Sequence, residues 1–143
     1  MERNALRALI PDETRLRFGE DIAPEYLSDT LGRLRGKASA LVFVRSTEEV
    51  SAVMKYAYAR NIPVTPRGAG TNLVGSTVPL DGGIILDLSQ MNRVLELDAD
   101  TMTVTVEPGL LLQDLQAYVE ARGLFYPPDP GEKTASIGGH INT

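Results

Sequence analysis

The sequence contains no cysteine, and its only histidine is His140. Without cysteine the chain cannot form a disulfide framework, a thiolate nucleophile, a cysteine-ligated zinc site or an iron–sulfur cluster. One histidine is also too few for the usual nitrogen-ligated metal centres, so we expect no metal site. The function of this stretch of polypeptide must therefore rest on other chemical groups.

Positive charge and long hydrophobic runs are also scarce. Lys and Arg number 14 against 19 Asp and Glu, which gives a formal net charge of -5 and an isoelectric point near 4.9. Nucleic acid and anionic membranes both require a basic protein surface, so neither is expected as the main partner. No stretch approaches the roughly 18 consecutive apolar residues of a membrane span, and the first residues do not form a signal peptide. We therefore expect a cytoplasmic chain.

Residues 1–37 are expected to form a helical and then irregular N-terminal extension. Apolar residues recur at helical spacing from residue 3 to residue 10, and Pro11 ends the pattern. Residues 12–37 are interrupted four times by glycine or proline, so no regular element is predicted there. The basic cluster at residues 33–37 is interpreted as a solvated face, with phosphate contact as the alternative.

Two parallel strands connected by a helix are predicted next. Residues 40–44 form a continuous apolar run, which is typical of a strand buried on both faces. Ser46 and Glu49 have the spacing of a capping box, and the apolar residues that follow predict a helix to about residue 60. Residues 62–65 then form a second strand, so the order indicates a right-handed parallel crossover.

The second half of the chain is predicted to contain a strand, a hairpin and a helix. Residues 84–88 are apolar enough for a third strand, and residues 94–97 and 101–107 are expected to pair as an antiparallel hairpin. The helix that follows should end at Gly123. Its buried stripe is expected to comprise Leu112, Leu115, Tyr118 and Val119. In residues 124–143 the apolar residues recur with neither the helical nor the strand period, so this segment is predicted to be a binding loop or a disordered tail.

The most informative stretch is residues 66–76, which we call the glycine loop. It reads P-R-G-A-G-T-N-L-V-G-S and follows the second predicted strand. Its three glycines allow the backbone to curl so that successive N–H groups face one anion, such as a phosphate or diphosphate. A P-loop is excluded because no Gly-Lys pair has the required spacing, and Leu73 occupies the position of the third Rossmann glycine. A surface turn without a ligand is the alternative interpretation.

A second glycine-rich stretch lies at residues 136–143, which we call the C-terminal segment. Gly138 and Gly139 are flanked by short polar residues, namely Ser136, Asn142 and Thr143. They offer further backbone donors of the same kind. A diphosphate has enough oxygen atoms to contact both stretches at once, so we expect the two to lie together.

These stretches belong to a longer succession of motifs. In order they are P-R-G-A-G-T-N-L-V-G, I-L-D-L-S-Q-M-N-R, V-E-P-G, P-P-D-P-G and S-I-G-G-H-I-N-T. The succession resembles the PCMH-type FAD-binding domain of the vanillyl-alcohol oxidase superfamily, in its GlcD-like glycolate oxidase and D-lactate dehydrogenase branch. The resemblance covers about residues 38–143. It implies an α+β fold, with a small parallel βαβ subdomain followed by a partial mixed or antiparallel subdomain, and with the rest of the FAD domain and the substrate domain absent.

The resemblance also implies which residues contact FAD. The implied cofactor-binding residues are Pro66, Arg67, Gly68, Ala69, Gly70, Thr71, Asn72, Gly75, Ser76, Pro128, Asp129, Ser136, Gly138, Gly139, Ile141, Asn142 and Thr143. Some relatives attach the flavin through a histidine where this chain has Thr71, so noncovalent FAD is implied. His140 is expected to line the cofactor pocket. An exposed guanidinium beside a turn is the alternative for Arg67, and Asp87 and Asn92 are expected to brace the loop rather than touch the ligand.

The implied activity is that of a flavoprotein oxidising D-2-hydroxy acids such as lactate or glycolate. The catalytic groups of the family lie in the absent part, so no catalytic residue is expected here and this segment alone should be inactive. The substrate, an electron-acceptor subunit and a place at the membrane periphery through such subunits would come with that part, and the segment could self-associate. Two alternatives are a non-redox nucleotide- or phosphate-binding module and a cell-wall precursor reductase that uses FAD and NADPH.

Overall fold

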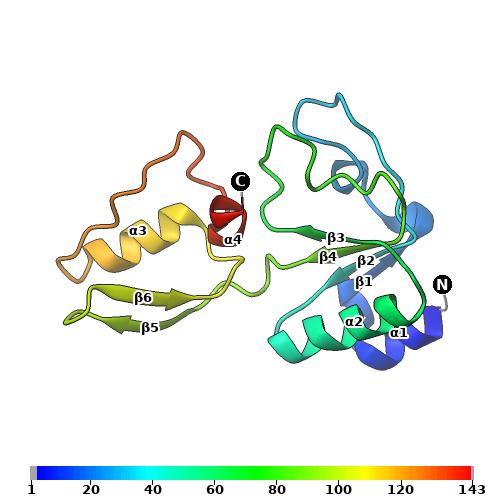
Figure 1. Ribbon diagram of the computed structural model, residues 1–143, viewed down its shortest axis with the longest axis horizontal. Helices are drawn as coiled ribbons and strands as arrows, with labels where there is room; N and C mark the ends of the chain where they lie inside the picture. The colour runs from blue at the N-terminus through cyan, green and yellow to red at the C-terminus, as the bar shows by residue number, and fades with distance from the viewer. Residues whose placement is uncertain (1–2, 143) are drawn as a thin grey trace.

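The computed structural model describes residues 3–142, and these form two lobes (Figure 1). The first lobe contains a four-stranded sheet and two helices on one face of it, and the second contains a hairpin and two helices. The elements of the first lobe are α1 (Arg3–Leu9), β1 (Leu16–Phe18), β2 (Ala40–Phe43), α2 (Thr47–Ala59), β3 (Val64–Arg67) and β4 (Ile84–Asp87). Those of the second are β5 (Val94–Asp98), β6 (Thr103–Val106), α3 (Leu112–Glu120) and α4 (Ile137–Ile141). This arrangement confirms the predicted α+β class.

The sheet of the first lobe has the order β1-β2-β4-β3. Strands β2 and β3 are parallel, as predicted, but they do not pair directly, because β4, for which no direction was predicted, lies between them and parallel to both. Strand β1 pairs antiparallel with β2, which opposes Leu16 to Val42. The prediction of an irregular segment after Pro11 was wrong at this strand and at three short 3₁₀ turns. Three residues are too few to show a period, and β1 is ordered by pairing with its neighbour.

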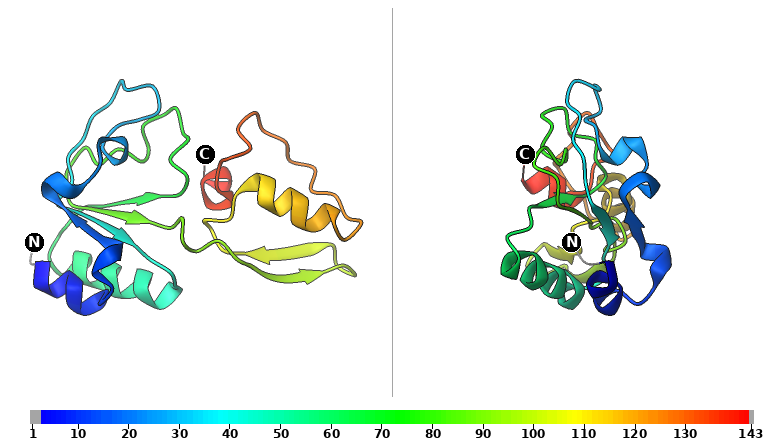
Figure 2. Two further views of the ribbon diagram at one scale, coloured as in Figure 1. Left: turned by 180° about the vertical axis from the view of Figure 1, so that it is seen from behind. Right: turned by 90° about the vertical axis from the view of Figure 1, so that its right-hand side faces the viewer.

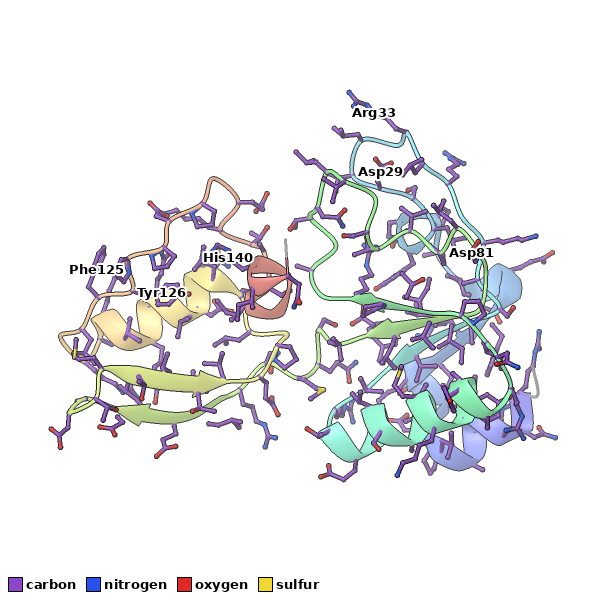
Figure 3. The ribbon with its side chains drawn as sticks, in the orientation of Figure 1. Asp29, Arg33, Asp81, Phe125, Tyr126 and His140 are labelled. Carbon is purple, nitrogen blue, oxygen red and sulfur yellow. The ribbon has the colours of Figure 1, made fainter. Side chains whose placement is uncertain are left out.

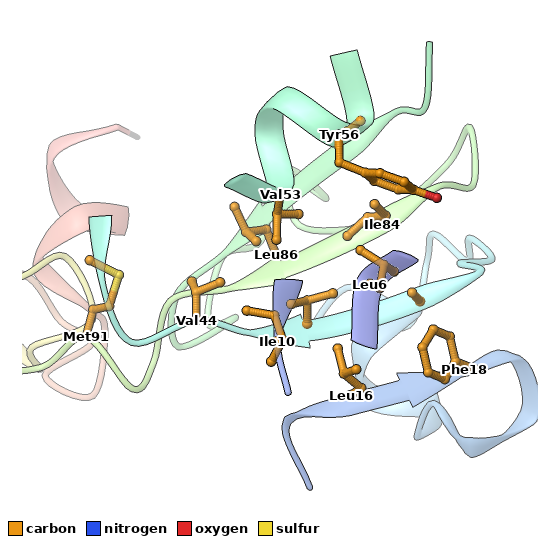
Figure 4. Close-up of a cluster of buried hydrophobic side chains, with 13 residues drawn as sticks. Leu6, Ile10, Leu16, Phe18, Val44, Val53, Tyr56, Ile84, Leu86 and Met91 are labelled. Carbon is orange, nitrogen blue, oxygen red and sulfur yellow. The ribbon is translucent and has the colours of Figure 1, made fainter. Parts of the chain in front are cut away.

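The main hydrophobic core lies between this sheet and helices α1 and α2 (Figure 4). Leu6, Ile10, Leu16 and Phe18, which precede residue 38, pack against Val42, Val44, Val53, Ile84 and Leu86 in the same cluster. Burying one such side chain stabilises the fold by roughly 1.5–3 kcal/mol. Residues 6–18 therefore contribute to the core of the first lobe.

The opposite face of the sheet is covered by loops (Figure 2). Leu41 and Ile85 point to that side and are fully buried against Ile22, with Tyr26 and Phe43 at the edge of the cluster. Strands β2 and β4 are thus buried on both faces, as the apolar run at residues 40–44 predicted. The glycine loop lies on this side of the sheet, above the ends of the strands.

The start of α2 shows only half of the predicted capping box. The Ser46 hydroxyl accepts a hydrogen bond from the Glu49 amide at 3.3 Å, as a helix cap should. The Glu49 carboxylate does not return to the Ser46 amide, because it binds the buried Arg15 guanidinium at 2.7 and 2.8 Å. This contact lowers the pKa of Glu49 and ties the segment before β1 to α2.

The second lobe follows the prediction closely, except at its end. Strands β5 and β6 form the antiparallel hairpin, and Gly123 lies just beyond α3 with a φ of +74°. Leu112, Leu115 and Val119 of the predicted stripe are buried, whereas Tyr118 is only partly covered. Among the described residues, no helix is long and apolar enough to cross a membrane.

The C-terminal segment is a short helix, α4, where we predicted neither helix nor strand. Two adjacent glycines disfavour a helix, so propensity alone gave no signal. The tertiary contacts outweigh this preference, because Ile137 is buried and its amide donates to the Leu110 carbonyl at 2.8 Å. The amide of Gly138 likewise donates to the Pro108 carbonyl at 2.8 Å. Thr143 lies outside the described residues.

The chain passes between the lobes once, at residues 88–93, and the turn at residues 107–109 of the second lobe packs against this segment. The buried Glu107 carboxylate binds the Arg93 side chain at 2.7 Å and accepts a hydrogen bond from the Arg93 amide at 2.9 Å. The amide of Gly109 donates to the Met91 carbonyl at 2.7 Å, and a Cβ at Gly109 would lie 2.1 Å from the Leu88 carbonyl oxygen. These contacts fix where the C-terminal segment lies relative to the glycine loop.

Candidate functional site

The glycine loop begins inside β3 and turns away from the sheet after Arg67. Gly70 and Gly75 both have positive φ, +73° and +74°, which a residue with a side chain adopts only at a cost. The side chain of Asn72 closes the loop, since its oxygen accepts from the Ser76 amide at 3.1 Å and its nitrogen donates to Thr77 at 2.9 Å. The curled backbone predicted from the glycines is present.

Arg67 points inward beneath the loop. Arg67 is only 9% exposed. Its guanidinium carbon lies 4.8 Å from the centre of the Tyr26 ring, which is a cation–π contact. A Cβ on Gly70 would lie 2.2 Å from one guanidinium nitrogen. The Nη1 atom of Arg67 is buried and has no hydrogen-bond partner within residues 3–142. The alternative of an exposed guanidinium beside a turn was therefore wrong.

Asp87 lies at the end of β4, beside Arg67 in the sheet register. It is almost completely buried, and it accepts a hydrogen bond from the Ser89 amide at 2.9 Å. Burial raises the pKa of its carboxyl, while the hydrogen bonds from Ser89 and the charge of Arg67 act in the opposite direction. Asp87 braces the turn after β4, and Asn92 is exposed on the segment between the lobes, so bracing of the glycine loop by these two residues stays a prediction.

The glycine loop and the C-terminal segment meet directly. The amide of Ala69 donates to the Ser136 hydroxyl at 3.4 Å, and the same hydroxyl accepts from the Gly139 amide at 3.4 Å. At Gly68 there is no room for a side chain, because a Cβ would lie 2.0 Å from the Ser136 oxygen. The structure therefore brings together the two stretches that the sequence paired.

Two adjoining hollows lie where these stretches meet. One is a cavity of about 310 Å³ and the other of about 340 Å³. Both are lined by Gly68, Ser76, Thr77, Ser136 and Gly139. The first extends along the rest of the glycine loop to His140, which Figure 3 labels beside α4. The second extends towards the segment between the lobes.

Most of the residues predicted to bind the cofactor line one of these hollows. They are Pro66, Arg67, Gly68, Ala69, Gly70, Thr71, Asn72, Ser76, Ser136, Gly138, Gly139 and Asn142, with His140 as an expected lining residue. Gly75, Pro128, Asp129 and Ile141 line neither: Gly75 is buried against Leu34, and the other three are exposed.

Sequence reasoning missed several lining residues. They are Leu73, Val74, Thr77, Leu88, Pro108, Pro130, Glu132 and Ala135. Leu73, Val74 and Thr77 are within or next to the glycine loop, so the loop itself was a sufficient signal for them. Leu88 lies on the segment between the lobes and Pro108 on the turn that packs against it; their motifs were quoted, but neither residue was given a role. For Glu132 and Ala135 the neighbouring P-P-D-P-G and S-I-G-G motifs were the only available signal.

The donors of the site suit an anion. Among the described residues, the amides of Gly70, Thr71 and Asn72 donate no hydrogen bond to another protein group. These three residues are half-buried, so their amides can donate to water or to a ligand. The Arg67 cation lies beneath these amides, whereas Glu132 on the opposite rim is ionised, its pKa lowered by hydrogen bonds from Thr134. An extended phosphate ligand is therefore favoured on the loop side of the cavity.

Comparison with known proteins identifies the family of this chain. A family model described as FAD binding domain matches residues 38–143. The chain is 44% identical over 131 residues to a D-lactate dehydrogenase of Anaerostipes hadrus, and 40% identical over 129 residues to the glycolate oxidase subunit GlcD of Bacillus subtilis. These alignments cover 90% of this chain but 27% and 26% of the relatives, so the chain spans about a quarter of their length.

Solved structures support the fold. The structure of an alkyldihydroxyacetonephosphate synthase superposes on 97% of this chain with a TM-score of 0.82 at 22% identity, and the match covers 28% of that protein. A structure of p-cresol methylhydroxylase matches 85% of the chain with a TM-score of 0.73 at 26% identity, over 24% of its own length. The resemblance described from the motifs is confirmed. The chain belongs to the FAD binding domain family, and FAD is its cofactor.

Proposed function

We propose that this chain forms the N-terminal, cofactor-holding part of a flavoprotein that oxidises D-2-hydroxy acids of the lactate or glycolate type. The observation that carries the proposal is the contact between the glycine loop and Ser136. Both line a cavity, and three loop residues that line it have amides without a protein partner. The names of the two relatives above support the substrate class. Residues 38–143 would be the first part of the FAD domain, and residues 1–37 its N-terminal extension.

In this proposal the backbone supplies most of the binding. The diphosphate of FAD would accept hydrogen bonds from the amides of Gly70, Thr71 and Asn72, with Ser136 and Gly139 closing the other side. Arg67 would contribute its positive charge from beneath the loop. Gly75, Pro128, Asp129, Ile141 and Thr143 remain proposed contacts for a longer part of the cofactor. The binding would be noncovalent, since Thr71 cannot form the histidyl link of some relatives.

The residues of this chain would bind and orient the cofactor rather than move the substrate proton. When bound, FAD supplies the acceptor for the hydride of the 2-hydroxy acid. A base near the substrate hydroxyl is also required, and we assign none within this chain. His140 would line the pocket without a catalytic role. The base, the substrate contacts and any electron-acceptor subunit would belong to polypeptide beyond this segment, as would a cytoplasmic or peripheral location.

Reduction of the bound flavin by candidate substrates tests this proposal. The protein, expressed from its complete open reading frame and kept free of oxygen, should lose its yellow absorbance when D-lactate or glycolate is added. NADPH should leave the spectrum unchanged. Loss of absorbance with NADPH, but not with either enantiomer of lactate or with glycolate, would favour the cell-wall reductase. A purified protein without flavin would favour the non-redox phosphate module.

A further inference from the structure

The outer side of the glycine loop is covered by residues 26–36, which we call the covering segment. This segment precedes residue 38, where the family match begins. Figure 1 shows it as the loop beside the glycine loop on the same face of the sheet, and Figure 3 labels Asp29 and Arg33 within it. None of its residues lines either hollow, so its role is indirect.

Two contacts join the covering segment to Gly70. The hydroxyl of Thr30 donates a hydrogen bond to the Gly70 carbonyl oxygen at 3.2 Å. From below, the ring of Tyr26 lies against the Arg67 guanidinium, which in turn fills the space where a Gly70 side chain would lie. Gly70, which lines the cavity, is therefore fixed from two directions.

A third contact holds the far end of the loop. The Leu34 side chain approaches Gly75 so closely that a Cβ there would lie 2.3 Å from a Leu34 methyl group. Gly75 has positive φ and is buried. The glycine at this position thus allows close packing against the covering segment as well as the turn itself.

The covering segment is itself held in one conformation. The buried Asp29 accepts a hydrogen bond from the Leu34 amide at 2.9 Å, and the Gly36 amide donates to the Leu27 carbonyl at 2.7 Å. Its end is attached beyond the glycine loop, where the Lys37 amide donates to the Pro79 carbonyl at 3.1 Å. Because these hydrogen bonds hold the covering segment in one conformation, its contacts can restrict the conformations of the glycine loop.

We propose that the covering segment is a positioning element of the cofactor site, which holds the glycine loop in its binding conformation before FAD arrives. A loop with positive φ angles and unpartnered amides loses conformational entropy when a ligand orders it, and a preformed loop avoids that loss. This inference rests on the proposed role of the loop in FAD binding. Tyr26, Thr30 and Leu34 act through the loop and do not touch the ligand.

Two substitutions with matched controls test this proposal. Thr30→Val removes the hydroxyl that binds Gly70, and Tyr26→Leu removes the ring beneath Arg67. Each should raise the FAD dissociation constant about fivefold, the ratio expected from one lost hydrogen bond or cation–π contact. The controls are Thr103→Val on β6 and Tyr58→Leu on α2, where the residue is 87% exposed. Both should leave the dissociation constant within about twofold of the original protein.

Amide hydrogen exchange of the cofactor-free protein provides a readout that needs no FAD. In Thr30→Val and Tyr26→Leu, the hydrogen-bonded loop amides of Ala69 and Ser76 should exchange several-fold faster, while the amides of strands β2 and β4 keep their protection. Unchanged exchange in the loop, or faster exchange with the same FAD affinity, would overturn the proposal. A third outcome separates the two proposals. If the unsubstituted protein does not bind FAD, but the glycine loop of both variants exchanges faster than the loop of that protein, the positioning role stands and the proposed function fails.

Discussion

Replacing Gly70 with valine should abolish the retention of FAD. The φ of +73° is disfavoured for any residue with a Cβ and most of all for a β-branched one, at a cost of roughly 1–3 kcal/mol. The new Cβ would also lie 2.2 Å from the Arg67 guanidinium, which cannot move without leaving the Tyr26 ring. Since both penalties act on the peptide proposed to face the diphosphate, the FAD dissociation constant should rise about 100-fold or more.

The matched control for this substitution is Gly123→Val. Gly123 has nearly the same φ, +74°, but no heavy atom lies within 4 Å of a Cβ there, and it follows α3 far from the cavity. This variant should lose a similar amount of stability through backbone strain and still retain FAD. Equilibrium dialysis against FAD, with thermal unfolding of each variant, separates the two effects. Full flavin occupancy in Gly70→Val would contradict the proposed contact.

Gly68→Ala should weaken FAD binding for a different reason. Gly68 does not have positive φ, so alanine causes no backbone strain, but its Cβ would lie 2.0 Å from the Ser136 oxygen and 3.0 Å from the Ser136 Cβ. Ser136 is 3% exposed, and its hydroxyl caps α4, so rotation of this side chain sacrifices the cap. The glycine loop and the C-terminal segment should therefore separate, and the FAD dissociation constant should rise about 10- to 30-fold.

A second substitution can restore the space that Gly68→Ala removes. Ser136→Gly deletes both atoms with which the new methyl group collides. The double variant should therefore bind FAD more tightly than Gly68→Ala, although it should remain weaker than the original protein because α4 loses its cap. Fluorescence titration with FAD measures all four proteins of this cycle. If the two effects simply add, the collision at Ser136 does not explain the loss.

Secondary structure could be predicted from the sequence mainly where an element is long enough to show a repeating apolar pattern. Helices α2 and α3, the parallel strands and the β5–β6 hairpin follow from apolar periodicity, because their burial pattern repeats over enough residues to be recognised. Strand β1 could not be found in this way, since Leu16–Phe18 is ordered by its pairing with β2. Helix α4 contradicts the propensity of its two glycines and depends on the burial of Ile137 and two backbone bonds to the preceding segment.

The site was predictable as a set of backbone positions but not as a set of side-chain directions. Glycine spacing indicated the curled loop, and its pairing with Ser136 agrees with the contacts of the structure. The inward direction of Arg67 could not be foreseen, because it depends on Tyr26, 41 positions earlier in a segment without a recognisable period. The contact of Leu34 with Gly75 was missed for the same reason.

The most direct test of the central claim is an amide chemical-shift titration of the isotopically labelled chain with FAD. The claim is that the glycine loop and the C-terminal segment together hold the diphosphate. The amides of residues 68–72 and of Gly138 and Gly139 should shift together and saturate at one FAD per chain, while the turn of the β5–β6 hairpin should not shift. Saturable binding that shifts neither stretch, or only one of them, would contradict the account.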